Sequence, residues 1–437
     1  MRRFILLLTL FCLSSVTALE VSAARKNILK IYNWSDYMDE SLLDEFEVWY
    51  QEQTGESIRI IYQTFDQNEV AVAKIERAKA DYDLVCPSEY IIERLLAADM
   101  LLPIEKDFGS TPNYLGNIAP YFTEQFDLLG TPEHRTSDYA IPFMWGTVGL
   151  LYNERTVSEE EVESWSIVWD KKFRNRVFLK DAVRDVYSVV QVYLNADKIA
   201  DGSATVAEVV NDYSDESISR AAQKLLEARD NIAGWESDFG KEMMTKEKAD
   251  ISLSWSGDAV WAIEEGADVG VSLNYAVPEE GSVIWFDGWV IPKYARNVKA
   301  ASYFINFMCR PDNALRNMDA IGYIPAVATL EILEEVIDES LDTYSDLSYM
   351  FGPEATSVQV DPIQYPDLSI VERCSMIRDF GDRAEDMMIM WAMVKGDNLS
   401  GGILAVIIVT ALLILGFYGY KRYSEYRMRR YRQLRRR

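Results

Sequence analysis

The chain has 437 residues, of which 70 are acidic and 44 basic, so its formal net charge is −26 at pH 7. This length is typical of about two domains, and an apolar content of 49% is enough for a sizeable core, which excludes wholesale disorder. The single histidine, His134, excludes metal sites that need two imidazoles. The P-loop, G-x-G-x-x-G and G-x-S-x-G motifs are absent, which removes the commonest nucleotide-binding and serine-hydrolase signatures.

Both ends of the chain carry targeting patterns. Residues 1–24 begin with Arg2 and Arg3, continue in an apolar run and end in small residues, which predicts a secretory signal peptide. Residues 398–420 contain no charged side chain, which predicts a transmembrane helix, and the basic tail 421–437 predicts a cytoplasmic end. We therefore expect the body of the protein on the periplasmic or extracytoplasmic face of the inner (cytoplasmic) membrane, anchored by its C-terminal helix.

The segment between these ends is more acidic than the whole chain, because both ends are basic. Such a surface repels nucleic acid and attracts cations, so we expect no nucleic-acid partner. Three cysteines follow the leader, Cys86, Cys309 and Cys374, and their wide spacing matches no metal motif. We therefore expect no metal and no cofactor, and an odd number of cysteines leaves at least one without an intramolecular disulfide.

Short apolar strands alternate with helical patterns along the first part of the chain. In chain order, the pattern predicts strands at residues 29–32, 58–62 and 82–86. Helices are predicted between them at 39–55 and 70–80, the first with Asp39 as N-cap and Gly55 as C-cap. This alternation predicts a parallel sheet with helices on both faces. The segment 139–152 interrupts it, and strands resume at 177–179, 251–255 and 271–277. Two α/β lobes are the economical interpretation.

Residues just past the predicted strands are the candidates for a binding site. In α/β sheets, ligands bind in the crevice outside the carboxyl ends of the strands. Five strand ends each supply an aromatic side chain, a carboxylate or both: Trp34, Ser35, Asp36 and Tyr37; Ser88, Glu89 and Tyr90; Asp181 and Asp185; Trp255 and Asp258; and Trp285 and Asp287.

Carboxylates beside indoles match the chemistry of an organic cation with an amine at each end. Each ammonium needs a carboxylate, because burying a charge without a partner is prohibitive. The methylene groups between the ammoniums need apolar walls, and aromatic faces supply these together with cation–π attraction of about 0.5 to 2 kcal/mol. The pattern therefore favours a polyamine as ligand.

Five segments then resemble, in the same order, signature segments of bacterial periplasmic spermidine/putrescine-binding proteins, the solute-binding components of polyamine ABC transporters. They are Tyr-Asn-Trp-Ser-Asp-Tyr at 32–37, Tyr-Asp-Leu-Val-Cys-Pro-Ser-Glu-Tyr at 82–90, Ile-Pro-Phe-Met-Trp-Gly at 141–146, Trp-Ser-Gly-Asp at 255–258 and Trp-Phe-Asp at 285–287. The resemblance covers roughly residues 27–330.

This resemblance implies an α/β, two-lobed periplasmic-binding-protein fold of type II, with the ligand in a cleft between the lobes. The C-terminal transmembrane helix is predicted in addition to this fold. We expect residues 25–142 and 286–330 to form lobe 1, and residues 143–285 and 331–397 to form lobe 2. The implied function is binding of putrescine or spermidine without catalysis, followed by delivery to the permease and ATPase subunits of an ABC importer.

The resemblance also implies roles for single residues. Trp34, Ser35, Tyr37, Ser88 and Tyr90 match the wall of lobe 1. Two carboxylates, Asp36 and Asp287, match a clamp for one terminal ammonium, and the rings of Trp255 and Trp285 match stacking positions on opposite sides. Asp258 matches a position that takes the other ammonium in putrescine-type members, and Asp185 matches an acidic position that serves longer ligands.

One departure from the family pattern bears on ligand choice. Spermidine-type members have two consecutive aspartates where this chain has Asp181 and Ala182, so a ligating carboxylate is lost at Ala182. Because Asp258 supplies a carboxylate elsewhere, we favour putrescine, with spermidine still open.

Other interpretations stay open at this point. Glu89 fits a helix start better than a ligand position, and Asp181 and Asp185 lie where a helix start would also explain them. A carboxylate pair with aromatic platforms also suits a carbohydrate-binding protein or glycoside hydrolase. A polyamine sensor that signals through its membrane anchor is a further alternative.

Overall fold

The computed structural model describes residues 25–237 and 239–396. The chain divides into two compact units, Met1–Ala384 and Glu385–Arg437. The first unit carries the two lobes, and the second begins within helix α18 (Ala384–Lys395). The predicted signal peptide, 1–24, and the basic tail, 421–437, lie outside the described residues.

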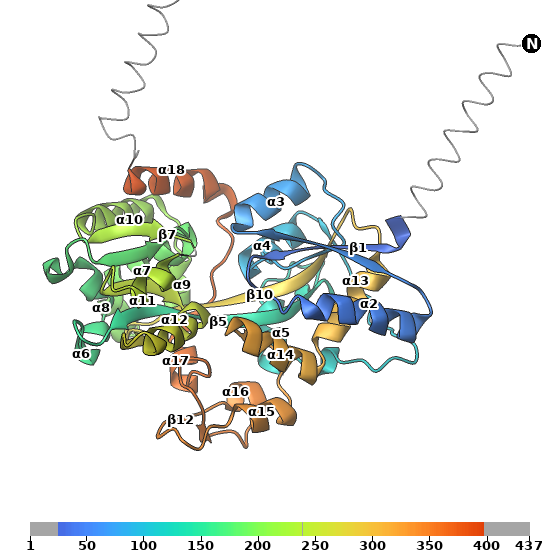
Figure 1. Ribbon diagram of the computed structural model, residues 1–437. Helices are drawn as coiled ribbons and strands as arrows, with labels where there is room; N and C mark the ends of the chain where they lie inside the picture. The colour runs from blue at the N-terminus through green and yellow to red at the C-terminus, as the bar shows by residue number, and fades with distance from the viewer. Residues whose placement is uncertain (1–24, 238, 397–437) are drawn as a thin grey trace, which may run out of the picture. The chain divides into compact units, whose positions relative to one another are not determined.

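Two long strands organise the first unit. β5 (Ala140–Asn153) and β10 (Ser282–Pro292) pair in antiparallel fashion, and every residue of both is buried. They stand at the middle of one sheet with the order β2-β1-β3-β10-β5-β8-β6-β7, so this sheet continues from one lobe into the other (Figure 1). The segment that interrupts the predicted alternation is thus a central strand, and its burial on both faces explains its apolar run.

The strands outside this pair run parallel within each lobe, as predicted. In lobe 1, β1 (Ile28–Trp34) lies between β2 (Arg59–Phe65) and β3 (Leu84–Val85). In lobe 2, β6 (Val177–Lys180) lies between β7 (Ile232–Glu236) and β8 (Ile251–Trp255). Short strands extend the sheet or form a separate pair: β4 (Leu101–Leu102), β9 (Leu273–Ala276), β11 (Ile324–Pro325), β12 (Tyr344–Ser345), β13 (Val358–Gln359) and β14 (Cys374–Ser375).

Helices connect the strands and cover the sheet. The first part of the chain contributes α2 (Ser41–Thr54), α3 (Asn68–Glu76), α4 (Glu89–Ala97), α5 (Pro120–Asp127) and α6 (Glu159–Val162). The middle part contributes α7 (Val183–Leu194), α8 (Ala196–Ala200), α9 (Val206–Val210), α10 (Asp215–Glu227), α11 (Gly240–Thr245) and α12 (Ser256–Asp268). The remaining helices of this unit are α13 (Val298–Met308), α14 (Pro311–Ile321), α15 (Leu330–Val336), α16 (Ser348–Phe351) and α17 (Leu368–Glu372).

The first helix shows how local sequence fixes these elements. Gly55 ends α2 with a left-handed backbone, φ +73°, and its N–H donates to the Gln51 carbonyl, which confirms the predicted C-cap. The predicted N-cap, Asp39, is wrong by one residue: Glu40 is the N-cap of α2, and Asp39 instead accepts a hydrogen bond from the Ser41 backbone at 3.0 Å. The buried face of α2 includes Phe46, whose ring packs on Phe304 of α13 at 5.0 Å.

The predicted fold is corrected in one part, the C-terminal transmembrane helix. About 20 apolar residues in helical form are needed to cross a hydrocarbon layer of about 30 Å. The longest helix in the described ranges, α2, has 14 residues, and none of the described helices is both long and apolar enough to cross a membrane. Residues 398–420 themselves lie outside the described part of the chain.

The predicted lobe boundaries remain a prediction. The boundaries at 142/143 and 285/286 fall within β5 and β10, the two strands shared by both halves of the sheet. Within the described residues Cys86, Cys309 and Cys374 are free thiols.

A buried carboxylate, Asp83, ties the central strands of lobe 1 together. Its two oxygens accept hydrogen bonds from the backbone N–H groups of Lys30, Arg296 and Asn297, at 2.9, 2.7 and 2.8 Å. The guanidinium of Arg25 completes the set at 2.9 Å. One side chain therefore joins β1, the start of β3 and the segment between β10 and α13.

Replacing this carboxylate is expected to destabilise the fold strongly. Asp83→Asn turns one acceptor oxygen into a donor and leaves buried N–H groups and the Arg25 guanidinium without compensation, so the free energy of unfolding should fall by about 3 to 5 kcal/mol. Urea denaturation of the full-length chain measures this loss. Asp81→Asn is the matched control: Asp81 also pairs with Arg25, but its side chain is 39% exposed, so a loss of about 1 kcal/mol or less is expected. Equal losses would contradict the role of Asp83.

Candidate functional site

The carboxylate of Asp287 lies at the centre of the candidate site. Asp287 belongs to β10, at a bulge where the register with β5 shifts. The hydroxyl of Tyr37 donates to its Oδ2 at 2.8 Å, and the hydroxyl of Ser88 donates to its Oδ1 at 2.6 Å. Asn68 supports this arrangement by donating to Ser88 and to the Tyr90 hydroxyl, at 3.0 and 2.6 Å. Three predicted segments of lobe 1 therefore meet at one carboxylate.

A second buried carboxylate, Asp185, comes from the other lobe. It lies in the first turn of α7, and the indole N–H of Trp255, at the end of β8, donates to its Oδ2 at 3.3 Å. The negative charge of Asp185 lies close enough to raise the pKa of Asp287. Among the described residues neither carboxylate forms a salt bridge, although the charges of Lys180 and Arg184 act on Asp185 from nearby.

Burial shifts the titration of these acids. Burial raises the pKa of Asp287 to about 6, although the hydrogen bonds from Ser88 and Tyr37 act in the opposite direction. The indole of Trp34 also acts against this rise, without meeting hydrogen-bond geometry. For Asp185, burial raises the pKa to about 6, against the Trp255 N–H and the charge of Lys180. The two acids are thus destabilised as anions and favour a cation that enters the site.

Aromatic rings pack beside these carboxylates. The Trp285 ring contacts Tyr323 at 5.5 Å, and Tyr323 contacts Tyr37 at 5.2 Å, which brings the rings next to Asp287. Trp285 lies so close to β5 that a Cβ on Gly146 would stand 2.6 Å from its ring. Tyr323 lies against α12, where a Cβ on Gly257 would stand 2.4 Å from it. Only glycine at these two positions leaves room for both rings.

Asp258 lies in a charge cluster that also contains lysines. Its Oδ2 accepts from Lys180 at 2.8 Å and its Oδ1 from Lys241 at 3.1 Å. The Lys180 ammonium also pairs with Glu236 at 2.9 Å and lies 4.1 Å from the centroid of the Trp255 ring. Burial opposes ionisation of Asp258, but the charges of Lys180 and Lys241 overcome it and lower its pKa.

Arg184 connects the two lobes beside the acids. Its guanidinium, on α7, forms a salt bridge with Glu69 of α3 at 2.7 Å. It lies between two rings, 3.8 Å from the centroid of Tyr90 and 4.0 Å from that of Phe380. The segment before Phe380 also contacts lobe 1, because Arg378 donates to Glu93 of α4 at 2.9 Å. These contacts therefore join the two lobes beside the buried acids.

The remaining predicted residues differ in their surroundings. Ser35 is half-buried, and its hydroxyl donates to Asp66 at 2.6 Å. Asp36 is exposed and has a left-handed φ of +50°, so it does not join the buried carboxylates Asp185 and Asp287. Glu89 is buried at the start of α4 and accepts from the Phe286 backbone at 3.0 Å, and burial raises its pKa well above the usual range. Asp181 is half-buried and its backbone N–H donates to the Glu236 carbonyl at 2.7 Å.

Sequence patterns missed several residues of this site. Lys180 is the last residue of β6, and a lysine at the end of an apolar strand is normally expected to be exposed to solvent. Its position one residue before the predicted Asp181 was the only available signal. Tyr323 follows the left-handed Gly322 that ends α14, and Arg184 sits beside Asp185 in the sequence. The sequence does not show that their side chains turn toward the crevice.

The family follows from comparison with known proteins. Residues 42–340 match the sequence profile described as bacterial extracellular solute-binding protein. The chain belongs to this family. The two-lobed α/β fold is that of a solute-binding protein, and the resemblance found in the sequence is confirmed.

Three relatives place the solute-binding protein more closely. It is 29% identical over 334 residues to the spermidine/putrescine-binding periplasmic protein of Escherichia coli, an alignment that covers 75% of this chain and 87% of that protein. It is 29% identical over 317 residues to the putrescine-binding periplasmic protein PotF of Escherichia coli, covering 70% and 79%. The crystal structure of the spermidine/putrescine transporter substrate-binding protein PotD of Streptococcus pneumoniae superposes with a TM-score of 0.62 at 29% identity, covering 85% of this chain and 100% of that one.

The raised pKa of Asp185 predicts a cost to the ligand-free protein. A shift from 3.8 to about 6 corresponds to about 3 kcal/mol. In the unfolded chain the group ionises near pH 4, but in the folded chain only near pH 6. The folded state therefore binds more protons between these values, and its stability falls as the pH rises through them. Asp185→Asn should stabilise the ligand-free chain by up to about 3 kcal/mol at pH 7.

The same variant should give only a small gain at pH 4, because there the folded parent still carries the proton and the unfolded parent has lost it from only about half of its molecules. Thermal and urea unfolding of parent and variant across pH 4 to 7 measure the difference. A gain that stays constant with pH would contradict the assignment of the shifted group.

Proposed function

We propose that this protein binds a polyamine in the crevice between its lobes, at the extracytoplasmic face of the membrane, and delivers it to the permease and ATPase subunits of an ABC importer. One observation carries the proposal. Two buried carboxylates, Asp185 and Asp287, come from different lobes and form no salt bridge among the described residues. A ligand that brings two ammoniums relieves both buried charges and links the lobes through them.

The aromatic walls support an alkyl chain between the ammoniums. Trp285 is only 8% exposed and Trp34 is half-buried, so both rings can cover methylene groups without leaving large apolar surfaces in water. The names of the relatives in Escherichia coli support the same ligand class. Binding breaks no bond, and we assign no catalytic residue.

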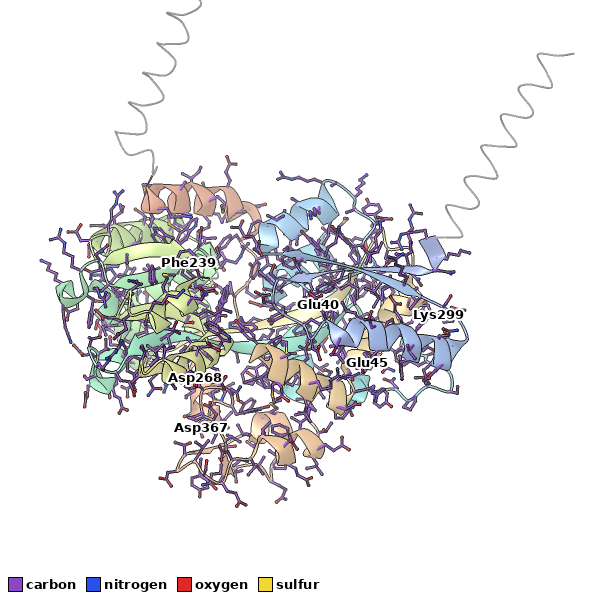
Figure 2. All side chains as sticks on the ribbon, in the orientation of Figure 1. Glu40, Glu45, Phe239, Asp268, Lys299 and Asp367 are labelled. Carbon is purple, nitrogen blue, oxygen red and sulfur yellow. The ribbon has the colours of Figure 1, made fainter. Side chains whose placement is uncertain are left out.

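The outer surface favours capture of cations. Exposed carboxylates such as Glu40 and Glu45, at and within α2, and Asp268, at the end of α12, stand on the outside of this unit (Figure 2). With a net charge of −26, the protein raises the local concentration of cations within about 10 Å of its surface at 0.1 M salt. This field attracts a polyamine but does not select one; selection belongs to the crevice.

Calorimetry with the full-length chain tests the ligand class. We expect heat of binding with at least one of putrescine, cadaverine, spermidine and spermine, and a preference for putrescine. Asp287→Asn should weaken binding at least a hundredfold, because the variant loses a buried charge that the ligand neutralises, and such a pair contributes about 3 kcal/mol or more.

Two further substitutions serve as controls for Asp287. Glu89→Gln should cost less than about threefold, since the buried Glu89 carboxyl favours its neutral form, which glutamine imitates. Asp268→Asn, at the exposed end of α12, should leave affinity unchanged. No heat with any of the four amines, together with binding of a sugar or an amino acid, would reject the proposed ligand class.

The affinity is also expected to depend on pH. The carboxylates must lose their protons to bind ammonium groups, and both have a pKa of about 6 in the ligand-free protein. Affinity should fall about tenfold for each carboxylate between pH 7 and pH 5, while the amines stay charged. Titrations at pH 6 in buffers with different ionisation enthalpies should show release of protons on binding. Constant affinity over this range would contradict the site.

A further inference from the structure

The second charge cluster of the crevice, formed by Lys180, Lys241, Glu236 and Asp258, is already complete. Two lysines face two carboxylates, so the charges of these four side chains balance. Lys180 is 2% exposed at its side chain and Asp258 is 6% exposed, so this pairing takes place away from water. Both oxygens of Asp258 are used, one by each lysine. The cluster therefore has no net charge left for a ligand.

The surroundings of the Lys180 ammonium are those that an ammonium ligand needs. It donates to Asp258 and contacts Glu236, and the Ser237 carbonyl lies 3.4 Å away. The Trp255 ring covers it at 4.1 Å, a cation–π distance. Carboxylates, a carbonyl oxygen and an indole face are together the coordination shell expected for one end of a polyamine. Here the side chain of Lys180 occupies that coordination shell.

The two clusters meet at one indole. The N–H edge of Trp255 donates to Asp185, and its ring face carries Lys180. Lys180 is also near enough for its charge to act on Asp185. A ligand that extends from Asp185 past the Trp255 ring would therefore bring a further ammonium next to the positive charge of Lys180. Like charges at such a distance repel strongly in a buried site.

We propose that Lys180 sets the length and charge of the ligand by acting as a resident ammonium. The crevice then accepts a diamine that spans Asp185 and Asp287, and it rejects longer polyamines whose further ammonium would need Asp258, Glu236 and the Trp255 face. This inference rests on the proposed polyamine binding. It explains how a crevice with four buried acids from both lobes selects a short ligand, because Lys180 and Lys241 neutralise two of them.

Replacement of Lys180 tests the inference by calorimetry with putrescine and spermidine. The parent full-length chain should bind putrescine at least tenfold more tightly than spermidine. Lys180→Met removes the resident ammonium, so affinity for spermidine should rise at least tenfold while affinity for putrescine changes less than threefold. In this background Asp258→Asn should cancel the gain for spermidine. In the parent chain the same substitution should change spermidine affinity less than threefold.

Lys241→Met is the matched control, because Lys241 pairs with the same carboxylate but is not stacked on Trp255. Its ratio of spermidine to putrescine affinity should stay within threefold of the parent. If Lys180→Met does not fold, Lys180→Met combined with Glu236→Gln keeps the cluster neutral and takes its place.

The outcomes separate the two proposals. Binding of putrescine with an unchanged preference in the Lys180 variants overturns the role of Lys180 and leaves the proposed function standing. Equal weakening of both amines also overturns it, because that result shows a purely structural residue. Absence of binding for every polyamine in the folded parent chain overturns the proposed function and this inference with it.

Discussion

The structure depends on the cost of holding carboxylates away from water without a salt-bridge partner among the described residues. Asp185 and Asp287 are buried, repel one another and are held by neutral donors such as Tyr37, Ser88 and Trp255. Neutral donors fix the direction of a carboxylate but do not cancel its charge. The fold therefore keeps a site that is destabilised when empty. A cation that neutralises these carboxylates removes this unfavourable free energy, which therefore contributes to its affinity.

The lysine cluster of the same crevice shows the other solution to the same physical problem. Where Asp258 and Glu236 are buried, the protein supplies its own ammoniums, and the charges of Lys180 and Lys241 lower the pKa of Asp258. The crevice is thus divided into an internally neutralised end and an end open to external cations. Both ends use the Trp255 ring, one through its edge and the other through its face. Selectivity in such a site comes from which acids are left unpaired, more than from how many acids are present.

Much of this arrangement can be predicted from the sequence, because short apolar runs identify the strands and ligands of α/β sheets bind at strand ends. The start of β1, the whole of β8 and the Gly55 cap follow from apolar periodicity and glycine alone, and the two strands place Tyr37 and Trp255. The burial of Lys180 could not be predicted, since it depends on Glu236 and Asp258, which reach it from elements distant in sequence. The exposure of Asp36 depends on one left-handed dihedral in a turn, for which aspartate gives only a weak signal.

The chain order of the central sheet also governs when lobe 1 can form. Val85 of β3 pairs with Val290 of β10, and Asp83 is completed by the N–H groups of Arg296 and Asn297. During synthesis on the ribosome, the first strands thus emerge long before their central neighbour. Until β10 arrives, β3 presents an open edge of the kind on which chains aggregate. Maturation of this protein therefore requires a nascent chain that is protected until most of it has been translated.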